Sequence, residues 1–235
     1  MNAVQLRRTF LDLTTPHIAD ACMRLGIPVR FAPAGMRPLW ENARVVGRAR
    51  PARHYGSVDV FLEAISHASP GDVLVIDNGN RQDEACVGDL VALEASRAGI
   101  SGIVIWGLHR DTTDLKTIRL PVFSTGTLPV GPQRLDRQED DALACALCGP
   151  HRVTADDVVV GDSDGVLFIP LARASEVAEV AATIRDTERS QAALMLMGTS
   201  LREQTRFDAF LAARRANPSL TFRQHLRSVG GEIEE

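Results

Sequence analysis

Residues 70–77, Pro-Gly-Asp-Val-Leu-Val-Ile-Asp, hold the strand signal that decides the architecture of this chain. Pro70-Gly71-Asp72 has the composition of a tight turn, because proline and glycine favour turn geometry. The run Val73–Ile76 is short and entirely apolar, which is typical of a strand buried on both faces of a sheet. Asn78-Gly79-Asn80 then begins a loop. We therefore expect a central buried strand at Val73–Ile76.

The segments downstream alternate between helical and strand patterns. A helix is predicted from Gly88 to about Ala98, and Ile103–Trp106 is a second buried strand. A loop at 107–111 leads to a short helix at Thr112–Ile118, and a third strand follows at Pro121–Ser124. Strands that alternate with helices in this way predict an α/β fold with a parallel sheet.

Helical patterns occupy both ends of the chain. Thr15 as N-cap and Pro16 at the first helical position predict an N-terminal helix. We divide the chain into an α/β domain, residues 1–170, and a helical C-terminal extension, residues 171–235, that packs on the core or on a neighbouring subunit. The extension is predicted to contain helices at Ala172–Met197, Leu201–Ala216 and Thr221–Val229, ended by Gly230-Gly231 and an acidic tail at 232–235.

Composition excludes several classes of protein. Basic residues number 26 and acidic residues 30, a formal net charge of −4, so we expect no nucleic-acid partner. We see neither a signal peptide nor an apolar run long enough to cross a bilayer, and we expect a cytoplasmic protein with no membrane partner. The Cys145-x-x-Cys148 spacing fits a metal or redox pair, or, as we favour, two small buried side chains.

Polar residues that suit catalysis follow the first two predicted strands. Asp89 begins the helix after Val73–Ile76, and twenty residues separate it from Arg110-Asp111, which follows Ile103–Trp106. That interval is about one helix plus one strand, so the chain returns to the same sheet edge, where α/β proteins bind ligands. Asp111 is a hard oxygen ligand suited to Mg²⁺, and Arg110 presents a planar fork to a carboxylate or an enolate oxygen.

The helix that begins near Asp89 adds an anion site. The backbone N–H groups of Leu90 and Val91 are free to bind a carboxylate there, and Asp89 is placed to hold a water that acts as a base. Each side chain also has a purely structural interpretation. Asp89 would favour the helix dipole, Asp111 would cap the next helix, and Arg110 would form a surface ion pair.

The element Asp89-x20-Arg110-Asp111, with Gly88 and Leu90 beside it, resembles the signature of the RraA-like family that includes the 4-hydroxy-4-methyl-2-oxoglutarate and 4-carboxy-4-hydroxy-2-oxoadipate aldolases. The resemblance covers about Thr14 to Pro170. It implies a swivelling β/β/α, phosphohistidine-domain-like fold and a homotrimer or dimer of trimers with sites near subunit contacts. Supporting segments are Thr15–Ala21, Pro70–Asp77 and Gly161–Val166.

The resemblance also implies a class II lyase that cleaves a 2-oxo acid through a pyruvate enolate, as an aldolase, an oxaloacetate decarboxylase or both. Asp111 would anchor Mg²⁺ or Mn²⁺, a Lewis acid for enolate formation. Arg110 would bind the keto oxygen of the substrate, and Asp89 would orient the water that serves as base. The pyruvyl carboxylate would bind at Gly88, Leu90 and Val91.

Two features depart from the family pattern. Trp106-Gly107-Leu108-His109 precedes Arg110 where we expect smaller or acidic residues. His109 is therefore a candidate general acid or substrate contact, or else a packing residue. The helical segment beyond Leu171 is longer than in the simplest members. These features leave open which 2-oxo acid is cleaved, by aldol cleavage, decarboxylation or elimination, and whether Mg²⁺ or Mn²⁺ is used.

Three other functions compete with the lyase as interpretations of this sequence. Some proteins of similar fold are non-catalytic regulators that bind a ribonuclease, and the complete Asp89, Arg110 and Asp111 set favours the enzyme. A methyltransferase is disfavoured because 77–80, Asp-Asn-Gly-Asn, offers no glycine-rich cradle for an adenosyl cofactor. A Schiff-base aldolase would have to use Lys116, the single lysine of the chain, so the metal route is favoured.

Overall fold

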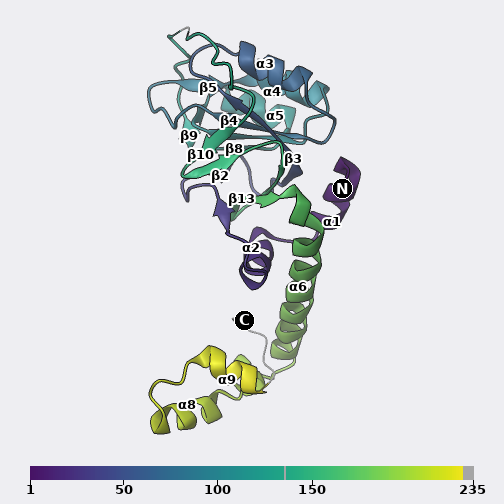
Figure 1. Ribbon diagram of the computed structural model, residues 1–235, viewed down its shortest axis with the longest axis vertical. Coiled ribbons are helices and arrows are strands. Elements are labelled where there is room, and N and C mark those ends of the chain that lie inside the picture. Colours follow the sequence, from purple (N-terminus) through teal and green to yellow (C-terminus); the bar gives the residue numbers. More distant parts are fainter. Residues whose placement is uncertain (135, 230–235) are drawn as a thin grey trace.

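The computed structural model describes residues 1–134 and 136–229 and has a mixed α/β fold (Figure 1). Its centre is an eight-stranded sheet in the order β1-β13-β12-β3-β4-β6-β8-β2. Strands β3, β4, β6 and β8 are parallel neighbours, which confirms the predicted parallel strands. The sheet contains β1 (Arg30–Phe31), β2 (Arg37–Pro38), β3 (Val45–Arg53), β4 (Val73–Asp77), β6 (Gly102–Trp106), β8 (Val122–Ser124), β12 (Asp157–Asp162) and β13 (Gly165–Pro170).

Burial on both faces explains the continuous apolar sequence of β4. Leu74 and Ile76 pack in one hydrophobic core, together with side chains from three helices. Val73 and Val75 belong to a second core on the other side of the strand, with Phe123 of β8. Both faces therefore select apolar residues, as is usual for parallel strands. The three helices are α3 (Asp59–Ser66), α4 (Asp89–Arg97) and α5 (Thr112–Ile118).

Short strands extend the carboxyl ends of the main sheet. A three-stranded parallel sheet in the order β5-β7-β9 forms from segments that closely follow β4, β6 and β8. The sequence pattern predicted loops at 78–87 and 107–111. That prediction was wrong in part, because strands of two or three residues are too short to show a period in their sequence. The added strands are β5 (Ala85–Val87), β7 (Leu108–His109) and β9 (Gly126–Thr127), and a separate hairpin contains β10 (Ala146–Cys148) and β11 (His151–Val153).

The N-terminal helix α2 (Thr15–Arg24) is held by a carboxylate that is distant in the sequence and adjacent in space. Thr14, and not Thr15, is its N-cap residue. Asp162 of β12 accepts hydrogen bonds from the backbone N–H of Thr15 at 2.8 Å and from its hydroxyl at 2.7 Å, and both residues are buried. The distant carboxylate supplies the acceptor that a capping side chain usually supplies.

Asp162→Ala is expected to lower the free energy of unfolding by about 3 kcal/mol, because it leaves the buried Thr15 N–H and hydroxyl without their charged acceptor. Urea unfolding followed by circular dichroism measures this change. Asp164→Ala is the matched control, since Asp164 is exposed and lies two residues away. Equal stabilities for the two variants would contradict the proposed cap.

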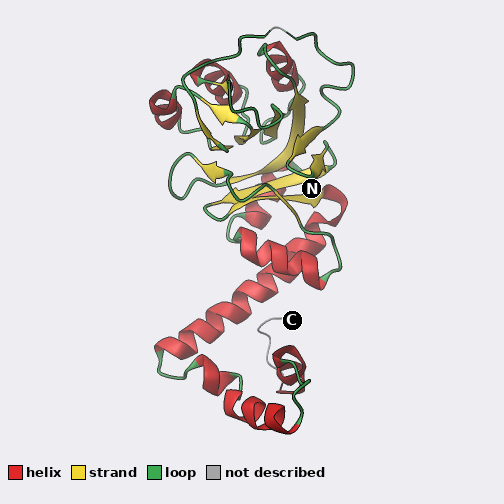
Figure 2. Cartoon of the chain, turned by 90° about the vertical axis from the view of Figure 1, so that its left-hand side faces the viewer, coloured by secondary structure: helices red, strands yellow, loops and turns green. Residues whose placement is uncertain are grey.

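The C-terminal segment leaves the domain along one long helix, α6 (Ala174–Leu196), after a short 3-10 turn at Leu171–Arg173 (Figure 2). The first half of α6 packs against α2 and α1 (Ala3–Phe10) in a third core, whereas Leu196 and Met197 at its far end are 90% and 84% exposed. The predicted single helix at Leu201–Ala216 is broken by Arg206, whose φ of 49° is left-handed. The later helices are α7 (Leu201–Gln204), α8 (Phe207–Ala216) and α9 (Phe222–Val229).

Aromatic side chains hold the last helices together. Phe207 and Phe210 of α8 pack against Phe222 of α9 with ring centroids 5.5 and 5.0 Å apart. Nε2 of His225 donates a hydrogen bond to the backbone carbonyl oxygen of Thr205 at 2.9 Å, which ties α9 to the break before α8. The predicted Gly230-Gly231 helix end and the acidic tail at 232–235 lie outside the described residues. Within the described ranges, no helix is long and apolar enough to span a membrane.

Candidate functional site

Two neighbouring strands of the small sheet bring the predicted site residues together. Val87 of β5 pairs in parallel with His109 of β7, and the backbone N–H of Arg110 donates to the carbonyl oxygen of Val87 at 2.9 Å. Because each strand ends at this pair, the residues that follow leave from the same edge. Asp89 begins α4 directly after β5, and Asp111 precedes α5 directly after β7.

The carboxylate of Asp111 lies over the start of α4. Its Oδ2 atom is 3.4 Å from the backbone nitrogen of Asp89, which donates to it, and 3.3 Å from Nε of Arg110. Gly88 makes this approach possible: a Cβ atom at that position would lie 2.3 Å from the same oxygen. Asp89, Arg110 and Asp111 therefore meet around Gly88.

Asp111 does not serve as an ordinary helix cap. It occupies the N-cap position of α5, but its backbone is left-handed, with φ 57° and ψ 40°, and its side chain makes no capping hydrogen bond. Positive φ is uncommon for a residue other than glycine and is often found where function demands it. The conformation directs the carboxylate to α4 instead of α5, so the Asp111 side chain does not cap α5 as the structural interpretation expected.

The guanidinium of Arg110 is 46% exposed and is backed by a loop that the sequence pattern did not single out. A Cβ atom on Gly131 would lie 2.4 Å from Nη1 of Arg110, so this loop passes directly against the guanidinium. The loop is anchored by the Ala85 backbone N–H, which donates to the carbonyl oxygen of Val130 at 2.7 Å. One feature of the sequence could have indicated this loop, namely the glycine between two prolines in Pro129-Val130-Gly131-Pro132.

The anion site at the start of α4 is partly filled by the protein itself. Oδ1 of Asp89 accepts a hydrogen bond from the backbone N–H of Leu90 at 2.8 Å. A substrate carboxylate at this place would take over that N–H from Asp89. Leu90 is 75% exposed, whereas the side chain of Val91 is buried in the core beneath α4.

The side-chain hydrogen bonds of His109 involve neither Asp89, Arg110 nor Asp111. Its ring is buried, with Nδ1 2.8 Å from the hydroxyl of Ser124 and Nε2 3.1 Å from the hydroxyl of Thr112. Burial lowers the pKa of His109 below its ordinary value, which favours the neutral ring. This geometry favours a role in positioning the start of α5 over direct proton transfer.

The donors at the site fit a divalent ion of the magnesium type. Asp111 provides a carboxylate directed at the start of α4, and Mg²⁺ sites in proteins use one or two carboxylates completed by water or substrate oxygens. Among the described residues, no group of three or more His, Cys, Asp or Glu side chains is arranged to hold a metal.

Other candidates from the sequence lie away from this group. Cys145 and Cys148 are free and buried, as favoured, and burial raises the pKa of the Cys148 thiol to about 12. Lys116 is exposed on α5.

Gly88→Ala is expected to lower catalytic turnover about 10²-fold, because the added Cβ must displace the Asp111 carboxylate and small misplacements at a reacting centre are costly. The backbone of Gly88, with φ −130°, accepts alanine, so the fold should persist. Gly35→Ala is the control, since a Cβ there meets nothing within 4 Å. Turnover unchanged in Gly88→Ala would show that the close approach has no role.

Comparison with known proteins defines the family. A family model for RraA-like proteins, described as Aldolase/RraA, matches residues 15–168. A Halalkalibacterium halodurans protein that is named, provisionally, as a 4-hydroxy-4-methyl-2-oxoglutarate aldolase is 35% identical over 147 residues, which is 62% of this chain and 69% of that protein. The chain belongs to the RraA-like family, as its sequence motifs indicated.

Solved structures agree with the fold. An uncharacterized protein of Pseudomonas syringae pv. tomato has a TM-score of 0.74 and 25% identity, over 86% of this chain and 97% of that one. RraAS2 of Streptomyces coelicolor, described as an unusual member of the RNase ES inhibitor RraA protein family, has a TM-score of 0.72 and 24% identity, over 82% of this chain and 99% of that one. The likeness to RraAS2, at 24% identity, concerns the fold alone.

Proposed function

We propose that this chain is a divalent-metal-dependent lyase that cleaves a 2-oxo acid through a pyruvate enolate, as a 4-hydroxy-2-oxo acid aldolase, an oxaloacetate decarboxylase or both. The meeting of Asp89, Arg110 and Asp111 around Gly88 carries the proposal. Resemblance to a relative named as an aldolase supports it.

Each residue has a role that follows from its chemistry. The substrate carboxylate binds the backbone N–H groups of Leu90 and Val91, where the start of α4 favours an anion. Arg110 donates to the keto oxygen and stabilises the negative charge that develops there as the C3–C4 bond breaks. Asp89 holds the water that takes the proton from the 4-hydroxyl group of an aldol substrate, and the return of that proton to C3 of the enolate completes the formation of pyruvate. Decarboxylation of oxaloacetate needs the same stabilisation of the enolate.

A divalent metal would be held by Asp111, with Asp89 close by. When bound, it supplies Lewis-acid stabilisation of the carboxylate and keto oxygens of the substrate. The Schiff-base route has less support, because Lys116 is exposed on α5 and a catalytic lysine is usually desolvated or placed beside another cation.

A pyruvate-release assay coupled to lactate dehydrogenase tests the proposal. The full chain is assayed with a panel of 4-hydroxy-2-oxo acids and oxaloacetate, with Mg²⁺, with Mn²⁺ and with EDTA. We expect turnover of at least one substrate that EDTA abolishes and added metal restores. Full activity in metal-free buffer would exclude the metal route, and no turnover on any substrate would leave the family assignment alone standing.

The non-catalytic alternative is an outcome of the same experiment. Two structural neighbours are described as RNA-processing or RNase inhibitors, at 24% and 22% identity. A chain that binds a ribonuclease and turns over no 2-oxo acid would belong with them. Four further features stay predictions: the swivelling fold, the division at residue 170, the trimer or dimer of trimers, and the cytoplasmic location. Sedimentation would measure the oligomeric state.

A further inference from the structure

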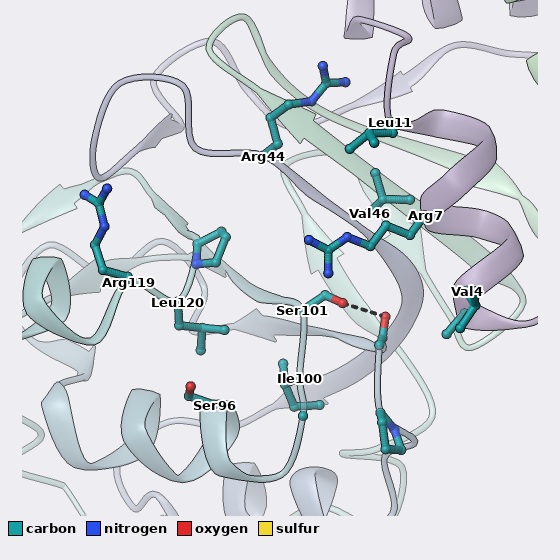
Figure 3. A pocket seen from close by; sticks show the side chains of 15 residues that line it. Val4, Arg7, Leu11, Arg44, Val46, Ser96, Ile100, Ser101, Arg119 and Leu120 are labelled. Carbon is teal, nitrogen blue, oxygen red and sulfur yellow. Dashed lines mark hydrogen bonds between the residues drawn. The ribbon is translucent and has the colours of Figure 1, made fainter.

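A cavity lies at the edge of the parallel strands opposite the candidate site (Figure 3). It has a volume of about 570 Å³, within the range of small-molecule sites. Helix α1 forms one wall, and the turns that lead into β4, β6 and β8 form the other. The turn residues include Pro70, Gly71, Ser101 and Pro121.

Three arginines line this cavity, which we call the arginine pocket. They are Arg7 on α1, Arg44 before β3 and Arg119 after α5, and Figure 3 shows them on different sides of the space. No aspartate or glutamate lines the pocket among the described residues, and within that part of the chain none of the three arginines forms an ion pair with a carboxylate. The pocket therefore carries uncompensated positive charge, which attracts anions.

The surroundings of two arginines hold them at the pocket without neutralising them. Arg44 donates to the carbonyl oxygens of Phe10 and Leu13. The guanidinium of Arg119 lies 5.4 Å from the ring centroid of Trp40, a cation–π contact. Arg119 also has a left-handed backbone, with φ 62°, at a helix end where glycine is the favoured residue.

Apart from Ser96 and Ser101, the remaining lining is apolar. Val4 of α1 and Leu11, which directly follows that helix, line the pocket although they are 78% and 52% exposed, and Ile100 and Leu120 lie on the other wall. A bare inorganic ion would leave these side chains in water. A ligand with a carbon skeleton would cover them, and charges at its ends would meet arginines on different sides.

We infer that the arginine pocket binds a small organic anion with two or more carboxylates. Guanidinium groups bind carboxylates through paired hydrogen bonds, which gives the pocket its specificity. The pocket is separate from the candidate active site. Helix α4 begins at Asp89 and ends beside Ser96 of the pocket, and its nine residues span about 13 Å.

Isothermal titration calorimetry on the full chain tests the inference. Succinate and tricarballylate are the probes, and acetate and inorganic phosphate are the comparison anions. Every titration uses the Arg110→Ala background in metal-free buffer, so that the candidate active site lacks both its guanidinium and any metal, and the matched variants below assign the binding that remains. Failure of this test therefore leaves the proposed lyase untouched, and failure of the lyase assay leaves this result untouched.

Arg7→Ala and Arg8→Ala form the matched pair of variants. Both remove one charge from the exposed surface of α1, and only Arg7 lines the pocket. We expect saturable binding of a di- or tricarboxylate in the parent and in Arg8→Ala, weakened about tenfold in Arg7→Ala. Arg119→Gly should weaken binding similarly while keeping the helix end intact, because glycine suits its backbone.

Several results would overturn the inference. They are the absence of saturable binding by either probe, equal binding in Arg7→Ala and Arg8→Ala, and acetate or phosphate bound as well as the probes. The fluorescence of Trp40 provides a second measurement in a Trp106→Phe variant, because Arg119 lies against its ring. Binding that leaves this fluorescence unchanged would place the anion elsewhere.

Discussion

Arg110→Ala is expected to lower kcat for pyruvate release about 10³-fold while the protein stays folded. Removing one donor that stabilises a developing oxyanion lowers turnover about 10²–10³-fold. We expect the loss of a charged guanidinium to fall at the upper end of that range. The side chain is 46% exposed, so its loss leaves no large cavity. Steady-state kinetics measure the change, and thermal unfolding checks the fold.

Arg97→Ala is the matched control for this variant. Arg97 is an exposed arginine in the last turn of α4, at the end of the helix farthest from Gly88. It should keep wild-type turnover, because only the charge near the reacting atoms matters. Arg110→Lys should recover little activity, since lysine lacks the planar fork of arginine. Near-normal turnover in Arg110→Ala would remove the central residue of the proposed mechanism.

Asp111→Asn is expected to abolish metal binding and to lower turnover by about 10³-fold, because a metal acting as Lewis acid contributes several kcal/mol. Asparagine is the better substitution, since it tolerates the left-handed backbone that Asp111 adopts. Asp111→Ala should lose the same activity and also some stability. Mn²⁺ binding followed by electron paramagnetic resonance gives a readout that does not depend on turnover.

Asp114→Asn is the control for metal binding. Asp114 is an exposed carboxylate in the first turn of the same helix, and it should keep full affinity for Mn²⁺. If Asp111→Asn binds Mn²⁺ as tightly as the parent chain does, the metal is held elsewhere. If it loses Mn²⁺ but keeps turnover, the reaction does not use that metal.

The sequence predicted three strands of the sheet, β4, β6 and β8, because their residues are almost all buried and apolar. Val73–Ile76 and Ile103–Trp106 have no room for a polar side chain, so their identity is visible without a structure. It also predicted that Asp89 and Arg110-Asp111 share one edge, since one helix and one strand separate them. The family follows from the same motif, and the comparison with known proteins confirms it.

The sequence was less informative wherever contacts join distant segments. The bonding of His109 depends on Ser124 and Thr112, and the capping of α2 depends on Asp162, 147 residues from Thr15. Neither contact leaves a periodic pattern. The break at Arg206 within the predicted helix was missed for a related reason, because a single left-handed residue changes the path without changing the composition.

The chain by itself therefore determined three of its buried strands, its family and the three polar residues of the candidate site, because apolar runs and spacing are properties of the local sequence. The tertiary structure alone decided how those residues meet: the β5–β7 pairing, the left-handed turn at Asp111 and the close approach at Gly88. It also gathered Arg7, Arg44 and Arg119 around one pocket. Such contacts depend on packing between segments far apart in the chain, which no local pattern records.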